Sequence, residues 1–464
     1  MSRLTKLRTY WPLLLALAGS APLLAQAPAP LLPGTPAPAA TPVPNPDAPI
    51  EITGGTSSVI PIAIPDMPTP HMTDTLAGST DVLGHEVAQV ITTDLRNSGL
   101  FTPTGTSLPS VSMPQVTAPD FAYWSSNSTS KLVEGFVLAN AANSLTIGCY
   151  LYDVPSKSEL ARQGYKVAAQ DWRRAAHKCA DVIYARLTGE GAYFDSRIVY
   201  IAESGPKAHR IKRLAIMDQD GANHHFLTNG QTLVLTPHVS PDHRSIVYMS
   251  YLGQRGRIYT YDIASGKQRL VVDSPNLTFA PRISPHNTWV LFSQSIAGET
   301  NIYRIPFAGG TPEALTATTG INTGGSYSPD GSKIVFESDR SGGQQLYVMN
   351  ADGSDQHRIS FGAGRYATPA WSPRGDLIAF THLGAGHFLI GVMTPAGSGE
   401  HLLTNSWQDE GPSWSPNGRV LTFARLTQNS GKSEIMAIDY TGANERHIVT
   451  PLDGSDPAWG GLLP

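Results

Sequence analysis

The chain has 464 residues, of which 41% are hydrophobic and only 15% are charged, and its formal net charge is −4. This length leaves room for two domains and a sizeable core. No run of basic residues could follow a phosphate backbone, so nucleic acid is not expected among the partners.

Residues 1–27 are predicted to be a secretory signal peptide. Three basic residues lie within the first eight positions, residues 11–24 are mostly apolar, and Ala25-Gln26-Ala27 fits a cleavage site. The apolar stretch is shorter than the roughly 20 residues that span a bilayer. We therefore expect an exported, soluble mature chain with 30 basic and 37 acidic residues, and so a net charge of −7.

Residues 28–49 are predicted to be a linker rich in proline and alanine. Nine prolines fall within these 22 residues. A segment of this composition cannot bury a core, and it behaves as an extended, semi-rigid spacer.

Residues 50–190 are predicted to form a small α/β domain. Period-two and helical patterns indicate strands at 59–65, 132–138, 145–152 and 164–168, and helices at 80–98 and between Asp171 and Gly189. Cys149 and Cys179 fall on core-facing positions of a strand and a helix. In an oxidising compartment they could form a disulfide, and two buried free thiols are the alternative. Residues 190–196 are expected to be a short hinge.

Residues 197–464 repeat one unit, and this repeat decides the fold. A Ser-Pro turn followed by apolar runs occurs in five copies, and successive copies lie 43 or 44 residues apart. The copies begin at Ser240, Ser284, Ser328, Ser372 and Ser415. A four-strand unit with this period is typical of a β-propeller blade.

Partial copies of the unit at residues 197–228 and 456–460 complete one more blade. We therefore predict a mainly β protein with a smaller α/β domain, in which the N-terminal domain is followed by a six-bladed β-propeller. Pairing of the C-terminal strand with the first blade would close the ring and remove its exposed sheet edges.

Motifs of common enzyme and metal sites are missing from the sequence. A propeller-type hydrolase would need a Gly-x-Ser-x-Gly elbow, and the nearest match, at residues 411–415, lacks the last glycine. No His-x-x-x-His or Cys-x-x-Cys spacing indicates a metal site. We therefore predict no catalytic residue, no metal and no cofactor. A propeller-type hydrolase or a carbohydrate-binding module is the alternative interpretation.

A propeller offers loops at two ends and a central channel as binding surfaces. The loops that enter each innermost strand converge on one mouth of the channel. Here they mix aromatic and polar groups, which suits a protein interface. The residues predicted to face a partner are Leu277, Thr278, Asn322, Thr323, Tyr366 and Asp409.

Three further stretches are more specific than the blade turns. They are GAYFDSRIVY at residues 191–200, KRLAIMD at 212–218 and PAW at 457–459. Together with the export signal, the small α/β domain and the six blades, they make residues 50–464 resemble the TolB family of the Tol-Pal system of Gram-negative bacteria.

The resemblance implies a non-enzymatic periplasmic adaptor that maintains outer-membrane integrity and supports envelope constriction during cell division. Such a protein would bind the peptidoglycan-associated lipoprotein Pal through the propeller mouth and TolA through a short N-terminal segment. Other outer-membrane proteins are further candidate partners. The residues that match the TolA-binding segment are Glu51, Ile52, Thr53, Gly54 and Gly55.

Overall fold

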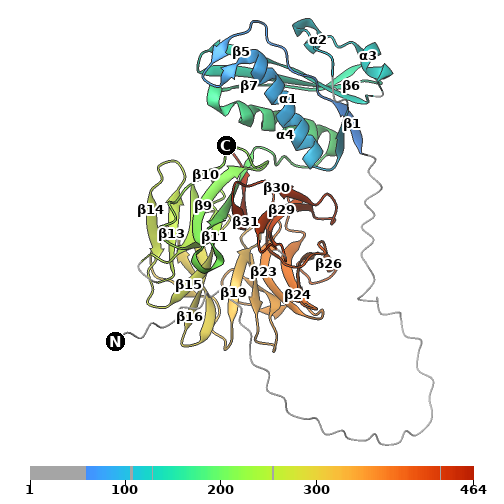
Figure 1. Ribbon diagram of the computed structural model, residues 1–464. Coiled ribbons are helices and arrows are strands. Elements are labelled where there is room, and N and C mark those ends of the chain that lie inside the picture. The colour runs from blue at the N-terminus through green and yellow to red at the C-terminus, as the bar shows by residue number, and fades with distance from the viewer. Residues whose placement is uncertain (1–58, 105–107, 128, 253–254, 429) are drawn as a thin grey trace, which may run out of the picture.

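The computed structural model describes residues 59–104, 108–127, 129–252, 255–428 and 430–464. It contains an N-terminal α/β domain set on one end of a six-bladed β-propeller (Figure 1), which confirms the predicted fold class. The predicted signal peptide, the proline-rich linker and the segment Glu51–Gly55 lie outside the described residues.

The N-terminal domain is built on a five-stranded sheet with the order β4-β1-β5-β6-β7. Its strands are β1 (Ile60–Ala63), β4 (Phe101–Pro103), β5 (Lys131–Ala141), β6 (Ser144–Asp153) and β7 (Ser158–Ala168). The long helices α1 (Thr80–Asn97) and α4 (Trp172–Thr188) cover one face of the sheet. The smaller elements are β2 (Asp74–Thr75), β3 (Gly78–Ser79), α2 (Met113–Thr117), α3 (Phe121–Ser126) and the 3-10 turn Ala169–Asp171.

The helices form where the sequence places apolar residues at helical spacing. On α1, Leu83, Val87, Ile91 and Leu95 follow one another at intervals of four residues and are fully buried. The chain leaves α4 through Gly189, whose φ of 75° is the left-handed conformation that favours glycine at a helix end.

Cys149 on β6 and Cys179 on α4 form a disulfide, with their Cα atoms 6.1 Å apart. The sequence leaves open a disulfide or two free thiols, and the structure contains the disulfide. It ties the helical layer to the sheet inside the N-terminal core.

The propeller consists of six four-stranded antiparallel sheets. From the innermost strand outward, blade 1 contains β31 (Asp453–Leu462), β8 (Ser196–Ser204), β9 (Ile211–Asp218) and β10 (His225–Phe226). A 3-10 turn, Lys207–His209, lies between β8 and β9. Blade 2 contains β11 (Val234–Val239), β12 (Ser245–Ser250), β13 (Arg257–Asp262) and β14 (Gln268–Val272).

The remaining blades follow in chain order. Blade 3 contains β15 (Leu277–Ile283), β16 (Trp289–Ile296), β17 (Glu299–Pro306) and β18 (Glu313–Ala314). Blade 4 contains β19 (Asn322–Tyr327), β20 (Lys333–Ser338), β21 (Gln345–Asn350) and β22 (His357–Arg358). Blade 5 contains β23 (Arg365–Trp371), β24 (Ile378–Gly384), β25 (His387–Met393) and β26 (His401–Leu402). Blade 6 contains β27 (Asp409–Trp414), β28 (Val420–Leu426), β29 (Ser433–Asp439) and β30 (Arg446–Ile448).

The C-terminal strand closes the ring, as predicted. β31 pairs antiparallel with β8, with Ser455 opposite Ile201 and Trp459 opposite Ile198. The Trp459 indole N–H donates a hydrogen bond to Ser196 Oγ at 2.9 Å. The last strand of the chain is therefore the innermost strand of the first propeller blade.

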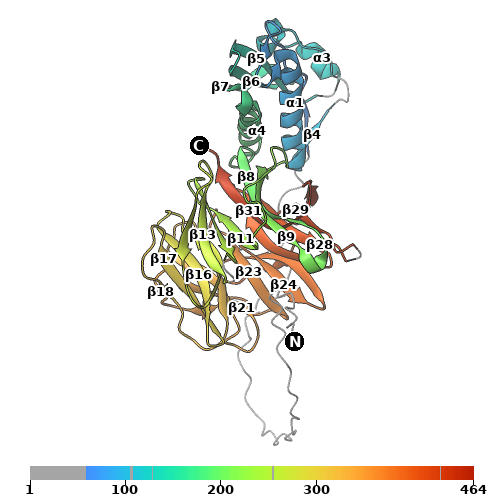
Figure 2. The same cartoon turned by 60° about the vertical axis from the view of Figure 1, so that its left-hand side comes forward.

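The N-terminal domain rests on the end of the propeller that carries the Ser-Pro turns (Figures 1 and 2). Glu190 accepts hydrogen bonds from Arg374 Nη2 at 2.8 Å and from Arg419 Nη1 at 2.9 Å. Asn417 Nδ2 donates to the carbonyl of Gly191 at 2.8 Å. The opposite end, where the innermost strands begin, carries none of these contacts, and we call it the open end.

Candidate partner-binding site

Large apolar side chains are exposed in the loops of the open end. Among described residues, Phe361 and Val449 are 71% and 69% exposed. The others in these loops or at their edges are Leu233, Leu252, Leu277, Ile296 and Trp407. Exposed large apolar residues at one end of a scaffold are typical of a protein interface. The open end is therefore the candidate partner-binding site.

The predicted partner-facing residues lie at this end, but five of the six are buried: Thr278, Asn322, Thr323, Tyr366 and Asp409. Asp409 accepts a hydrogen bond from Arg425 Nε at 2.8 Å, and the Tyr366 hydroxyl donates to Glu400 at 2.8 Å. In the free chain these five side chains hold the entry loops to the blades, and their contact with a partner stays a prediction. Only Leu277 is exposed, at 42%.

One residue in each innermost strand adopts a left-handed backbone conformation, with φ between 47° and 67°. These residues are Thr236, Ala280, Gly324, Thr368, Gly411 and Asp456. Each stands where the register with the neighbouring strand shifts. Four of the six are not glycine, and such strained positions gather at functional sites.

This ring of bulges was not predicted from the sequence, although five of its six residues precede a proline. Proline inside a strand is confined to edges and bulges because it cannot donate to the ladder. An Xaa-Pro pair that recurs with the spacing of the blades could therefore have predicted the bulges.

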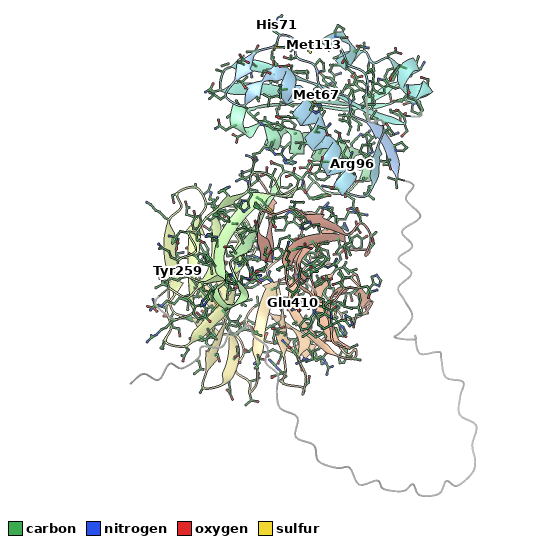
Figure 3. All side chains as sticks on the ribbon, in the orientation of Figure 1. Met67, His71, Arg96, Met113, Tyr259 and Glu410 are labelled. Carbon is green, nitrogen blue, oxygen red and sulfur yellow. A yellow bond between two sulfur atoms is a disulfide. The ribbon has the colours of Figure 1, made fainter. Side chains whose placement is uncertain are left out.

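Ionisable side chains on the inner strands lie in a poorly solvated environment around the channel. Burial raises the pKa values of Glu410 and Asp456, and Figure 3 marks Glu410 on the propeller. Burial also lowers the pKa of Arg282 to about 10 and that of His238 to about 3. In each case burial disfavours the charged form of the side chain.

Glu337 on β20 supports one of the bulges. Its Oε2 accepts a hydrogen bond from the Thr368 backbone N–H at 3.0 Å, and burial raises the pKa of Glu337 to about 7. The folded chain thus holds this proton more tightly than the unfolded chain. The stabilisation is fully present below the ordinary glutamate pKa of 4.5 and is lost as the pH rises through about 7.

Glu337→Gln should therefore flatten the pH dependence of stability, because the amide keeps an oxygen for the Thr368 N–H and does not ionise. Between pH 5.5 and pH 8 the unmodified chain should lose about 1–2 kcal/mol more unfolding free energy than the variant. Urea unfolding at both pH values measures this difference. The exposed Glu299→Gln is the control, and equal pH slopes for Glu337→Gln and the unmodified chain would contradict the expectation.

The two domains meet at a buried junction, not at the expected hinge. The Asp181 carboxylate on α4 accepts hydrogen bonds from the backbone N–H groups of Tyr193, Phe194 and Asp195, at 2.8, 2.8 and 3.0 Å. Tyr193 and Phe194 are fully buried. The expectation that residues 190–196 form a hinge is corrected, since a buried and hydrogen-bonded connection cannot bend freely.

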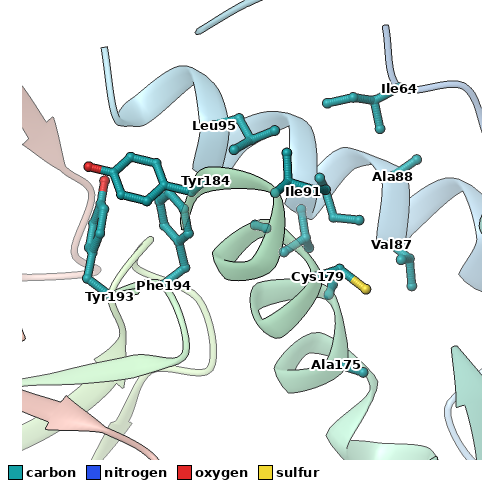
Figure 4. Packing of buried hydrophobic residues seen from close by; sticks show 14 of the residues in the cluster. Ile64, Val87, Ala88, Ile91, Leu95, Ala175, Cys179, Tyr184, Tyr193 and Phe194 are labelled. Atoms are coloured by element: carbon teal, nitrogen blue, oxygen red, sulfur yellow. The ribbon is translucent and has the colours of Figure 1, made fainter. Parts of the chain in front are cut away.

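Aromatic rings extend the junction into a core shared by both domains. Tyr184 packs edge-on against Tyr193 and Phe194, with ring centroids 5.6 and 5.4 Å away (Figure 4). Tyr193 also contacts Trp459 of the closing strand at 6.1 Å. One hydrophobic cluster therefore runs from the N-terminal helices into blade 1.

Together, the fold and the open end define a two-domain propeller protein, capped at one end and suited to binding another protein at the other. Within the described ranges, no helix is long and apolar enough to cross a membrane. Models of the TolB amino-terminal domain and the TolB beta propeller domain match residues 48–160 and 184–463. The chain belongs to the TolB family and is a component of the Tol-Pal system.

Relatives support this assignment along almost the whole chain. The Tol-Pal system protein TolB of Zymomonas mobilis is 68% identical over 416 residues, covering 89% of this chain and 91% of that protein. Its counterpart in Rhizorhabdus wittichii is 65% identical, covering 89% and 94%. The crystal structure of TolB from Acinetobacter baumannii superimposes with a TM-score of 0.77 at 26% identity, covering 87% of this chain and 97% of that one.

Proposed function

We propose that this chain is a non-enzymatic periplasmic adaptor that binds Pal at the open end of its propeller. The observation that carries the proposal is the set of exposed apolar side chains at the end that the N-terminal domain leaves free. Burying such side chains against a partner stabilises the complex by roughly 25 cal/mol per Å² of apolar surface. Because the relatives are named as Tol-Pal system proteins, we look for this partner within the Tol-Pal system.

We further propose that the segment Glu51–Gly55 binds TolA, so that one chain connects two proteins of the cell envelope. This link would serve outer-membrane integrity and constriction during cell division. Deleting residues 51–55 should abolish capture of TolA and leave Pal binding unchanged. Capture of TolA by the deleted chain would refute this part of the proposal.

Charge placed on the open end should weaken Pal binding. Phe361→Glu and Val449→Glu each put a carboxylate where an apolar side chain would be buried, so we expect at least a tenfold rise in Kd, about 1.4 kcal/mol. Titration against the soluble domain of Pal measures it. Met72→Glu in the N-terminal domain is the matched control, since Met72 is 72% exposed. Unchanged affinity in both open-end variants would overturn the placement of the Pal site.

A further inference from the structure

Three side chains of residue types that can bind a metal converge at the junction, and they come from two domains. His177 belongs to α4, Asp218 ends β9, and Asp220 follows in the next turn. One donor atom from each lies within 4.8 Å of the other two. Figures 1 and 2 both place α4 above blade 1. The group could not be predicted from the sequence, because His177 lies 41 residues before Asp218.

The His177 ring is held with one nitrogen aimed at the two carboxylates. The ring is 2% exposed, and Nδ1 lies 2.7 Å from Asp94 Oδ2 in a hydrogen bond. Gln219 Nε2 donates to the other Asp94 oxygen at 2.7 Å, which fixes this carboxylate. When one imidazole nitrogen of a histidine binds a metal, the other nitrogen is usually hydrogen-bonded to a group such as a carboxylate.

The second nitrogen, His177 Nε2, is buried and has no hydrogen-bond partner among the described residues. It lies 3.9 Å from Asp218 Oδ2, which is too long for a hydrogen bond. Zinc binds such donors at about 2.0–2.2 Å, which places two tetrahedral donors roughly 3.4 Å apart. Small side-chain movements would therefore bring the group to coordination distance.

A cavity of about 430 Å³ lies next to the group, and Arg173 and Met217 are among the residues that line it. Arg173 lines this cavity, donates a hydrogen bond to Asp220 and lies 3.6 Å from Asp218. Its Nε has no hydrogen-bond partner within the described part of the chain. An entering cation would take over the two carboxylates, and the arginine side chain, which is 18% exposed, would turn into the cavity.

We propose that His177, Asp218 and Asp220 form a divalent-metal site that clamps α4 of the N-terminal domain to blade 1 of the propeller. One imidazole and two carboxylates form a mixed nitrogen and oxygen set, which suits zinc better than calcium or magnesium. Water would complete the coordination. Because the donors come from both domains, the bound ion fixes how the domains are oriented.

The test uses the full mature chain after removal of metals with EDTA, titrated with zinc by calorimetry. We expect one ion per chain, and a melting temperature that rises with zinc. Asp220→Asn and His177→Gln should each weaken binding at least tenfold and abolish that rise. His225→Ala is the matched control, because this exposed imidazole lines the same cavity outside the donor group.

X-ray absorption of the zinc-loaded unmodified chain tests the site without relying on a variant. We expect one imidazole nitrogen and otherwise oxygen donors. The proposal is overturned if the unmodified chain binds no zinc, which would leave an ion-pair network around a protonated His177. It is equally overturned if His225→Ala removes binding, or if two imidazoles coordinate the ion.

Discussion

Removing residues 453–464 is expected to lower the melting temperature of the propeller by more than 10 °C or to prevent folding. The deletion takes away β31, the innermost strand of blade 1, and leaves the inner edge of β8 unpaired. It also removes Trp459, which is 8% exposed and belongs to the core shared with the N-terminal domain. Truncating a buried tryptophan alone costs about 3–5 kcal/mol, a large part of a typical stability.

Single substitutions distinguish the effect of losing ring closure from the general effect of shortening the chain. Trp459→Ala should destabilise the chain by about 3–5 kcal/mol, whereas Trp407→Ala at the open end should change stability little, since Trp407 is 40% exposed. Calorimetry of the deletion and both variants makes the comparison. If the truncated chain had the same melting temperature as the intact protein, the ring would not depend on its last strand.

The ring could be predicted because each blade repeats the same local chemistry. In the turn after β19, Ser328 Oγ donates to Asp330 at 2.5 Å and accepts from the Lys333 backbone N–H at 2.9 Å. Those partners lie two and five residues away, so the turn can be recognised in a short window of sequence. The constant spacing of the copies then gave the order of the blades and the closing strand.

The side-chain roles at the open end could not be predicted, because they depend on residues distant in the sequence. Asn322 is the first residue of β19, and the sequence predicts a loop residue at this position. In the structure its amide donates to the carbonyl of Thr300, and its side-chain oxygen accepts from Arg340 Nη2. These partners lie 22 and 18 residues away. The polar character of a loop residue therefore does not decide whether its side chain meets solvent or a neighbouring strand.

The domain junction was hidden for the same reason. His177 and Asp94 are 83 residues apart and come from different helices, and Gln219 joins them from the propeller. The segment formed by residues 190–196 is short and contains a glycine, which is typical of a hinge. Only the packed structure reveals that Asp181 binds three of their N–H groups.

Asp181→Ala is therefore expected to destabilise the chain by about 3–5 kcal/mol. The change leaves three buried N–H groups without an acceptor, and each costs about 1–3 kcal/mol, partly offset because a desolvated carboxylate is also removed. That desolvation raises the pKa of Asp181 to about 6. Urea unfolding should show the loss, and limited proteolysis should show faster cleavage within residues 189–196 as the connection opens.

Two further variants identify the cause. Asp181→Asn keeps Oδ1 for Tyr193 and Phe194 but turns an amide N–H toward the Asp195 N–H, so its stability should fall between those of the alanine variant and the unmodified chain. Asp66→Ala, at a side chain that is 62% exposed and paired with His85, should cost less than about 1 kcal/mol. If Asp181→Ala matched Asp66→Ala, the connection would be held by its aromatic packing alone, and the carboxylate would have no part in fixing the domains.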